Sequence, residues 1–333
     1  MTEVWTFAWD HGSGEVQALG GMLGPVWFDI GQPKSVQPFF VASWAEEPGH
    51  ERLPGLLRRL RGEWPCVPFG LDRASPPAGW LGKAPSIADA APHGYGANND
   101  WSLVDRGSDW IEIGITYPDT HPVRSLRRRI AGMPGAATLE ITLEIEAADE
   151  IDLGLALHPT FRLPAAAGAA TLDVAGFRRG MTFPEPLDVS SLAAPGQWFD
   201  CLERVPGRTG QHLDFTRLPA AVPSEDILQL QADVGSVRLS NHEEGWQAQV
   251  RYDAGLFPTA ILWVTNQGWS ASPWLRRTRA LGIEPARAAF DLGQTVSADP
   301  DNPLSLEGIP TSIRMAAGEI LATRYSIGLE PLE

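Results

Sequence analysis

The chain has 333 residues, and its 41 acidic residues outnumber 26 basic ones to give a net charge of −15. A surface of that sign repels phosphate backbones and anionic lipid, so we expect neither nucleic acid nor a membrane as partner. Cys66 and Cys201 are too few for a disulfide framework and have no metal-ligand spacing. The first thirty residues lack a signal-peptide pattern and no apolar run spans a membrane, so we expect a cytoplasmic protein.

Short, alternating segments dominate the chain, and residues 56–60 (LLRRL) are compatible with one short helix. Apolar and polar residues alternate with period two, as in half-buried antiparallel strands, over residues 110–117, 138–146, 227–234, 237–240 and 247–252. Turn clusters such as Met133-Pro134-Gly135 separate them. The apolar run 260–264 (AILWV) predicts a strand that is buried on both faces.

Two further segments have a predicted place in the sheets. Residues 312–329 indicate a final hairpin that turns at Ala317-Gly318. The run Arg127-Arg128-Arg129 indicates a solvated strand edge that opposes aggregation. Because no internal repeat, low-complexity tract or linker divides the sequence, we expect a single all-β domain over residues 1–333 with few short helices.

Five segments together resemble the aldose 1-epimerase, or galactose mutarotase-like, superfamily, in the order that this superfamily shows. They are residues 61–70 (RGEWPCVPFG), 93–101 (HGYGANNDW), 153–161 (LGLALHPTF), 213–217 (LDFTR) and 281–285 (LGIEP). Some of these motifs are most similar to the hexose-6-phosphate mutarotase branch. The resemblance implies an antiparallel β-supersandwich that binds a small sugar or sugar derivative and needs no metal or organic cofactor.

The resemblance also implies a catalytic pair, with Glu284 as general base and His158 as general acid. Mutarotation moves a proton from the anomeric hydroxyl and another onto the ring oxygen, and the pKa values of a carboxylate and an imidazole can be tuned for both tasks. A lone histidine is more often structural, and the Leu-His-Pro-x-Phe context favours function for His158. Residues 328–331 (GLEP) repeat the pattern around Glu284, so the motif also arises by chance.

The remaining candidate residues would bind the sugar. The resemblance implies contacts from His93, which could instead be only a turn residue, and from Asp226, for which Glu225 is an alternative. Arg61 matches a phosphate-binding arginine of the hexose-6-phosphate branch. Its expected second arginine is absent, with Asn98 near that place, so a neutral sugar or sugar acid fits at least as well. Indoles that could stack on the sugar ring are Trp64, Trp101 and, best placed, Trp263.

The sequence leaves a second function open, a non-catalytic carbohydrate-binding protein of the same fold. Retention of both His158 and Glu284 favours the enzyme. The sequence does not specify the sugar, and it is compatible with a monomer or a homodimer.

Overall fold

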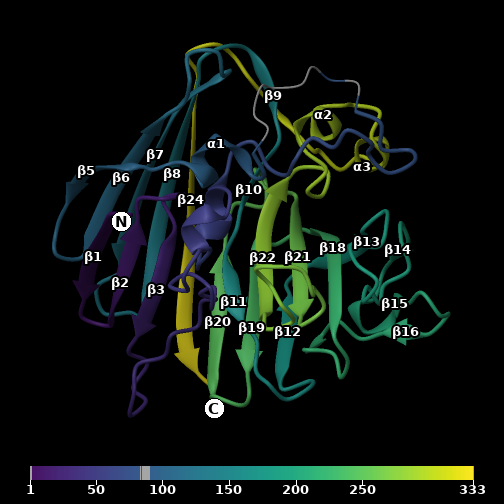
Figure 1. The fold of residues 1–333 in the computed structure, drawn as a ribbon, viewed down its shortest axis with the longest axis horizontal. Helices are drawn as coiled ribbons and strands as arrows, with labels where there is room; N and C mark the ends of the chain where they lie inside the picture. Colours follow the sequence, from purple (N-terminus) through teal and green to yellow (C-terminus); the bar gives the residue numbers. More distant parts are fainter. Residues whose placement is uncertain (1, 83, 85–90, 333) are drawn as a thin grey trace.

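The computed structural model describes residues 2–82, 84 and 91–332, in which two large antiparallel sheets pack face to face (Figure 1). Sheet I has the strand order β17-β12-β19-β20-β24-β8-β7-β6-β5, and sheet II has the order β14-β13-β18-β21-β22-β10-β4, with β11 also paired to β22. The predicted all-β antiparallel supersandwich is confirmed.

The strands of sheet I are β5 (Ser102–Arg106), β6 (Trp110–Thr116), β7 (Val123–Gly132), β8 (Thr138–Ala147), β12 (Ala170–Val174), β17 (Arg217–Leu218), β19 (Ser236–Asn241), β20 (Trp246–Arg251) and β24 (Ile320–Pro331). Those of sheet II are β4 (Pro65–Cys66), β10 (Leu155–Leu157), β11 (Thr160–Arg162), β13 (Phe177–Thr182), β14 (Trp198–Phe199), β18 (Ser224–Ala232), β21 (Thr259–Asn266) and β22 (Arg279–Arg287). All the predicted strands are present in these two sheets.

Smaller elements surround the two sheets. A separate sheet comprises β1 (Val4–Trp9), β2 (Gly12–Gln17) and β3 (Leu23–Phe28), and two short ladders pair β15 (Val205–Pro206) with β16 (His212–Leu213) and β9 (Ile151–Leu153) with β23 (Ile313–Met315). The helices are α1 (Gly94–Asn98), α2 (Gln294–Ser297), α3 (Pro303–Leu306) and the 3₁₀ turns η1 (His50–Arg52), η2 (Gly55–Arg58) and η3 (Leu202–Arg204). Within the described ranges, no helix is both long and apolar enough to cross a membrane.

The two faces of sheet II have different surroundings. Leu262 of β21 and Ile283 of β22 belong to the hydrophobic core that also contains the inner side chains of sheet I. Their neighbours Ile261 and Trp263 point the other way and belong to a second apolar cluster, which loops cover. Every residue of β21 is therefore buried, as the apolar run predicts. The second cluster contains the candidate site.

Two predictions about the sheets are wrong. The tail turns near Ala317-Gly318, but its two arms do not pair with each other: β23 pairs with β9, and β24 pairs with β8 and β20. The arginine run lies in β7, between β6 and β8 and not at an edge. Arg128 is 1 % exposed because its guanidinium pairs with Glu63, which also accepts a hydrogen bond from Tyr325 Oη at 2.6 Å.

Candidate active site

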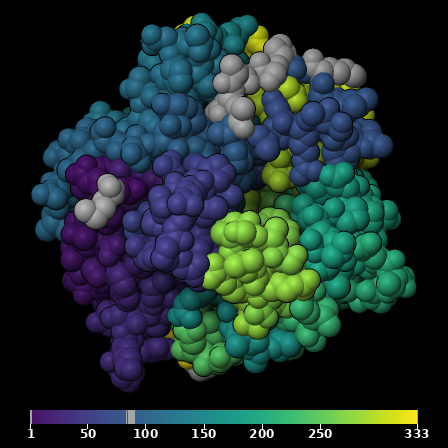
Figure 2. Space-filling view, viewed as in Figure 1, coloured from purple at the N-terminus to yellow at the C-terminus, as the bar shows by residue number. Residues whose placement is uncertain are grey.

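A pocket of about 250 Å³ lies on the loop-covered face of sheet II. Its floor comes from β21 and β22, and its walls come from η2, the segment before α1 and the loop after β21. Figure 2 shows the surface hollowed between this loop, coloured lime, and the violet-blue segment that carries η2. The pocket is large enough for a single small ligand.

Glu284 is placed in the floor by the alternation of β22. Its neighbours Ile283 and Pro285 face away from it along the strand, and Glu284 itself is 2 % exposed. The absence of a side chain at Gly282 makes room for the carboxylate, because a Cβ there would lie 2.5 Å from Glu284 Oε1. The sequence motif therefore has a steric reason for its glycine.

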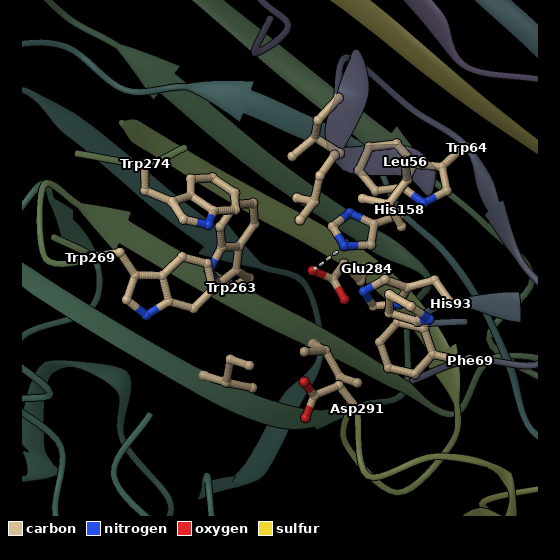
Figure 3. A pocket seen from close by; sticks show the side chains of 15 residues that line it. Leu56, Trp64, Phe69, His93, His158, Trp263, Trp269, Trp274, Glu284 and Asp291 are labelled. Carbon is tan, nitrogen blue, oxygen red and sulfur yellow. Dashed lines mark ion pairs between the residues drawn. The ribbon is translucent and has the colours of Figure 1, made fainter. Parts of the chain in front are cut away.

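His158 lies at the corner between β10 and β11, opposite Glu284. Its backbone N–H donates to Trp64 O at 2.9 Å, and its ring stacks on the Trp64 indole at a centroid distance of 4.1 Å. Its Nε2 lies 3.2 Å from Glu284 Oε1, the contact drawn as a dashed line in Figure 3. The structure thus brings together two residues that are far apart in the sequence.

The surroundings of the pair favour its uncharged form. Burial, together with the neighbouring His93, lowers the pKa of His158 well below its usual range. Burial, together with the negative charge of Asp291, raises the pKa of Glu284 well above its usual range. Both shifts oppose charge, and a protonated carboxyl donating to a neutral imidazole satisfies the 3.2 Å contact.

The hydrogen bonds of Thr160 fix the matching tautomer of His158. The Thr160 hydroxyl donates to His158 O at 3.4 Å, and its Oγ1 lies 3.1 Å from His158 Nδ1. Oγ1 then accepts from Nδ1–H, which leaves the lone pair on Nε2 facing Glu284.

His93 and Asp291 complete the polar part of the pocket. His93 packs against His158 at a ring distance of 5.2 Å, and burial lowers its pKa to about 4. Its Nδ1 is buried and has no hydrogen-bond partner among the described residues. Figure 3 shows Glu284 between His158 and Asp291, whose pKa is raised by burial against the opposing effect of Arg73.

Three indoles form an apolar wall beside His158 and Glu284, and we call Trp263, Trp269 and Trp274 the tryptophan wall. Trp263 comes from β21, and the other two come from the loop that follows it. The predicted Trp263 and Trp64 therefore line the pocket. Trp101 instead lies in the core between the sheets, where its Nε1 donates to Gly96 O at 2.8 Å.

The structure corrects the expectation for Asp226. Ile227 lines the pocket, and strand alternation turns Asp226 to the opposite face of β18. The Asp226 carboxylate accepts from the backbone N–H groups of Leu192 and Ala193 at 3.0 and 2.9 Å, so it holds a loop. The alternative, Glu225, is not a lining residue either, and its carboxylate holds the loop after β21.

Arg61 and Asn98 also lie outside the pocket lining. Arg61 is 4 % exposed, donates from Nε to Arg59 O at 3.1 Å and lies 3.9 Å from Glu46. Asn98 accepts from Leu56 N–H at 3.0 Å and donates to Pro92 O at 2.7 Å. Its amide thereby joins two walls of the pocket, which is a structural role that a motif comparison does not reveal.

Several lining residues are missing from the sequence prediction: Leu56, Leu57, Leu60, Phe69, Trp269, Trp274 and Asp291. Most belong to loops without periodicity, so only the Trp-x4-Trp spacing and the short distance of Asp291 from Glu284 in sequence could have drawn attention to them. In the described part of the chain, no group of three or more His, Cys, Asp or Glu residues could hold a metal ion.

Solved structures share this architecture over their full length. A galactose mutarotase-like protein from Lactobacillus casei ATCC 334 has a TM-score of 0.65 at 12% identity, with 98% of this chain and 100% of that chain covered. The GalM/aldose epimerase homologue from C. elegans has a TM-score of 0.67 at 11% identity, with 100% of both chains covered. No protein-family model matches the sequence, and a comparison with curated proteins gave no match. The chain therefore has the galactose mutarotase-like fold.

Proposed function

We propose that the protein is an aldose 1-epimerase-like isomerase that interconverts the anomers of a small sugar by general acid/base ring opening. The observation that carries the proposal is the 3.2 Å contact between His158 Nε2 and Glu284 Oε1 in a pocket of monosaccharide size. Two buried groups whose pKa values are displaced in opposite directions are typical of an acid/base pair. The fold supports the proposal and leaves the substrate open.

Ring opening requires one proton to leave the anomeric hydroxyl and another to reach the ring oxygen. The base takes the O1 proton while the O1 electron pair forms the C1=O1 double bond. The C1–O5 bond breaks, and its electron pair takes the proton of the acid. Rotation about C1–C2, followed by the reverse steps, closes the other anomer and returns both protons.

The single mobile proton of the resting pair is sufficient for this cycle. A neutral Glu284 with a neutral His158 carries the same number of protons as a carboxylate with an imidazolium. Transfer of the proton from Oε1 to Nε2 therefore creates the base and the acid together, and no proton has to enter from solvent. His93, buried beside His158, would contact the ring or anomeric oxygens.

The rate at which the two anomers of a sugar interconvert is measured directly by NMR. We expect the protein to increase the exchange rate between the α and β anomeric signals of at least one aldose above the spontaneous rate in the same buffer. Neutral hexoses, pentoses, uronic acids and hexose phosphates form the test set. Quenching of tryptophan fluorescence by a sugar of this set, while the exchange rates of all its members stay spontaneous, would identify a carbohydrate-binding protein and contradict the proposal.

A further inference from the structure

The pocket has one polar end and one apolar end. His93, His158, Glu284 and Asp291 supply its polar side chains, whereas the tryptophan wall and the side chain of Ile227 supply hydrocarbon. Figure 3 shows the three indoles together on one side of Glu284, with His93 and Phe69 on the other. A pyranose in this pocket would have part of its ring against groups that make few hydrogen bonds.

The tryptophan wall is held in place by a buried carboxylate. Glu225, which is 0 % exposed, accepts from Thr265 Oγ1 at 2.6 Å and from the N–H groups of Gly268 and Trp269 at 3.1 Å each. The indoles of Trp269 and Trp274 pack at a centroid distance of 4.7 Å, and Trp274 also packs on Trp44 at 4.8 Å. These contacts fix the position of the tryptophan wall.

The charges around the pocket disfavour an anion. None of the described side chains that line it is Lys or Arg, while two lining residues, Glu284 and Asp291, are carboxylic acids. Arg61, the expected phosphate contact, is directed to Arg59 O and Glu46. A phosphate or carboxylate on the ligand would lose its hydration without gaining a cationic partner.

The proposed acid/base chemistry orients the sugar in this pocket. If His158 protonates the ring oxygen, O5 lies beside a ring whose neighbours include Trp263, at a centroid distance of 6.2 Å. Trp64 at 4.1 Å and His93 at 5.2 Å are closer to the His158 ring, and the orientation that places C5 and C6 on the side of the tryptophan wall is the one that leaves O1 and O5 near His93 and Glu284. Asp291 lies on the side of Glu284 away from His158 in Figure 3, where C2 would lie in this orientation.

We infer that the site selects aldoses with an apolar C5–C6 edge, namely 6-deoxyhexoses, over hexoses with a C6 hydroxyl and over hexose 6-phosphates. This inference rests on the proposed function, which supplies the orientation. The indole N–H groups of the wall donate hydrogen bonds and cannot accept them, so the oxygen of a C6 hydroxyl could accept from Trp263 Nε1–H, but its hydrogen finds no acceptor on the wall. A C6 methyl group instead gains contact area.

Three sugars of one configuration provide the test: D-galactose, 6-deoxy-D-galactose and D-galactose 6-phosphate, each followed by NMR anomer exchange. We expect kcat/KM for the 6-deoxy sugar to exceed that for D-galactose by about 10- to 100-fold, the range for an apolar pocket that meets one extra hydroxyl. The phosphate should be turned over least. The D-gluco series repeats the comparison with the opposite configuration at C4.

Variants at Trp274 separate the polarity of the wall from its shape. Trp274→Gln introduces an acceptor and should reduce the preference to within about threefold. Trp274→Phe keeps the wall apolar and should retain the preference even if its stability falls. Trp198, an exposed indole of β14 outside the pocket, provides the control Trp198→Gln, in which the ratio should stay at the wild-type value.

Two contrary results are distinguishable. Turnover of the three sugars at rates within twofold of each other, or a preference for the phosphate, overturns the inference and leaves the isomerase proposal standing. Acceleration of no sugar in either series overturns the isomerase proposal. Fluorescence titration with the same sugars then decides the inference: tighter binding of the 6-deoxy sugar supports it, and equal binding overturns it.

Discussion

The same pattern, Gly-apolar-Glu-Pro, occurs within a long strand of each large sheet, and its glutamate has opposite surroundings in the two places. In β22 of sheet II, Glu284 is 2 % exposed, whereas in β24 of sheet I, Glu330 is exposed. The apolar residues of both copies, Ile283 and Leu329, belong to the core between the sheets.

Both glutamates therefore point to the outer face of their sheet. Loops that carry η2, Trp269 and Trp274 cover the outer face of sheet II, whereas Gln247 of the neighbouring strand β20 lies beside Glu330. Local sequence determines the direction in which the glutamate points, and the chain that covers it determines whether it is buried. Chemistry is expected only in the covered copy.

The largest difference between the two copies is expected in catalysis. Glu284→Gln keeps the size of the side chain and removes its ability to exchange a proton, so the anomer-exchange rate should fall by about 10²- to 10⁴-fold. Glu330→Gln is the matched control and should retain the wild-type rate. NMR exchange on the best sugar measures both, and wild-type turnover in Glu284→Gln would remove the assigned base.

His158→Asn extends the comparison to the partner side chain. Asparagine stays polar but transfers no proton at neutral pH, so a loss similar to that of Glu284→Gln is expected. If the two residues act in one step, the double variant should cost less in activation free energy than the sum of the single variants. Fully additive losses, measured by the same exchange assay, would mean that the two side chains act independently.

The predicted strands and the candidate pair, His158 and Glu284, rest on different sequence signals. Alternation predicted β6, β8, β18, β19 and β20, because each of these segments must bury one face. His158 and Glu284 were expected from the ordered motifs, and the structure places them 3.2 Å apart. That the whole chain forms one domain stays a prediction.

What the sequence did not predict depends on contacts between distant segments. Trp269 and Trp274 line the pocket from a loop whose sequence has no periodicity. Glu225 of β18 holds this loop by accepting a hydrogen bond from the backbone N–H of Trp269. Asp226 carries the right chemistry, but the alternation of β18 turns it away from Ile227 and the pocket. The tail turns where expected, yet its arms join different partners because β9 and β8 are available to them.

Arg128 of sheet I forms a buried ion pair with Glu63, which extends the comparison of the two sheets to the free energy of unfolding. Arg128→Met leaves Glu63 without its cationic partner in a site with no exposure, which should cost about 3–5 kcal/mol of unfolding free energy. Arg127→Met, one residue away and exposed, should cost at most about 1 kcal/mol. Urea unfolding measures both, and equal losses would show that burial does not distinguish the two arginines.

The last prediction concerns how Glu284 and Glu330 each contribute to the pH dependence of the free energy of unfolding. Because the folded-state pKa of Glu284 is raised, the folded protein keeps a proton that the unfolded chain loses above about pH 4.3. Stability therefore falls as pH rises from there toward the folded pKa, by up to about 1.4 kcal/mol per pH unit. The lowered pKa of His158 acts in the opposite direction, since it removes stability as pH falls below about 6.5.

Glu284→Gln removes the first contribution, so its stability relative to the wild type should increase as pH rises above about 4.3 toward the folded pKa of Glu284, while its activity is lost. Shifted groups that do not contact Glu284, such as Glu225 with a pKa of about 7, are common to both proteins and cancel in the difference. Glu330→Gln should follow the wild-type profile, because its carboxylate is exposed in the fold. Urea midpoints across this pH range measure the difference. A variant curve parallel to the wild type would mean that Glu284 is ionised in the resting protein, and the shared-proton description of the pair would be wrong.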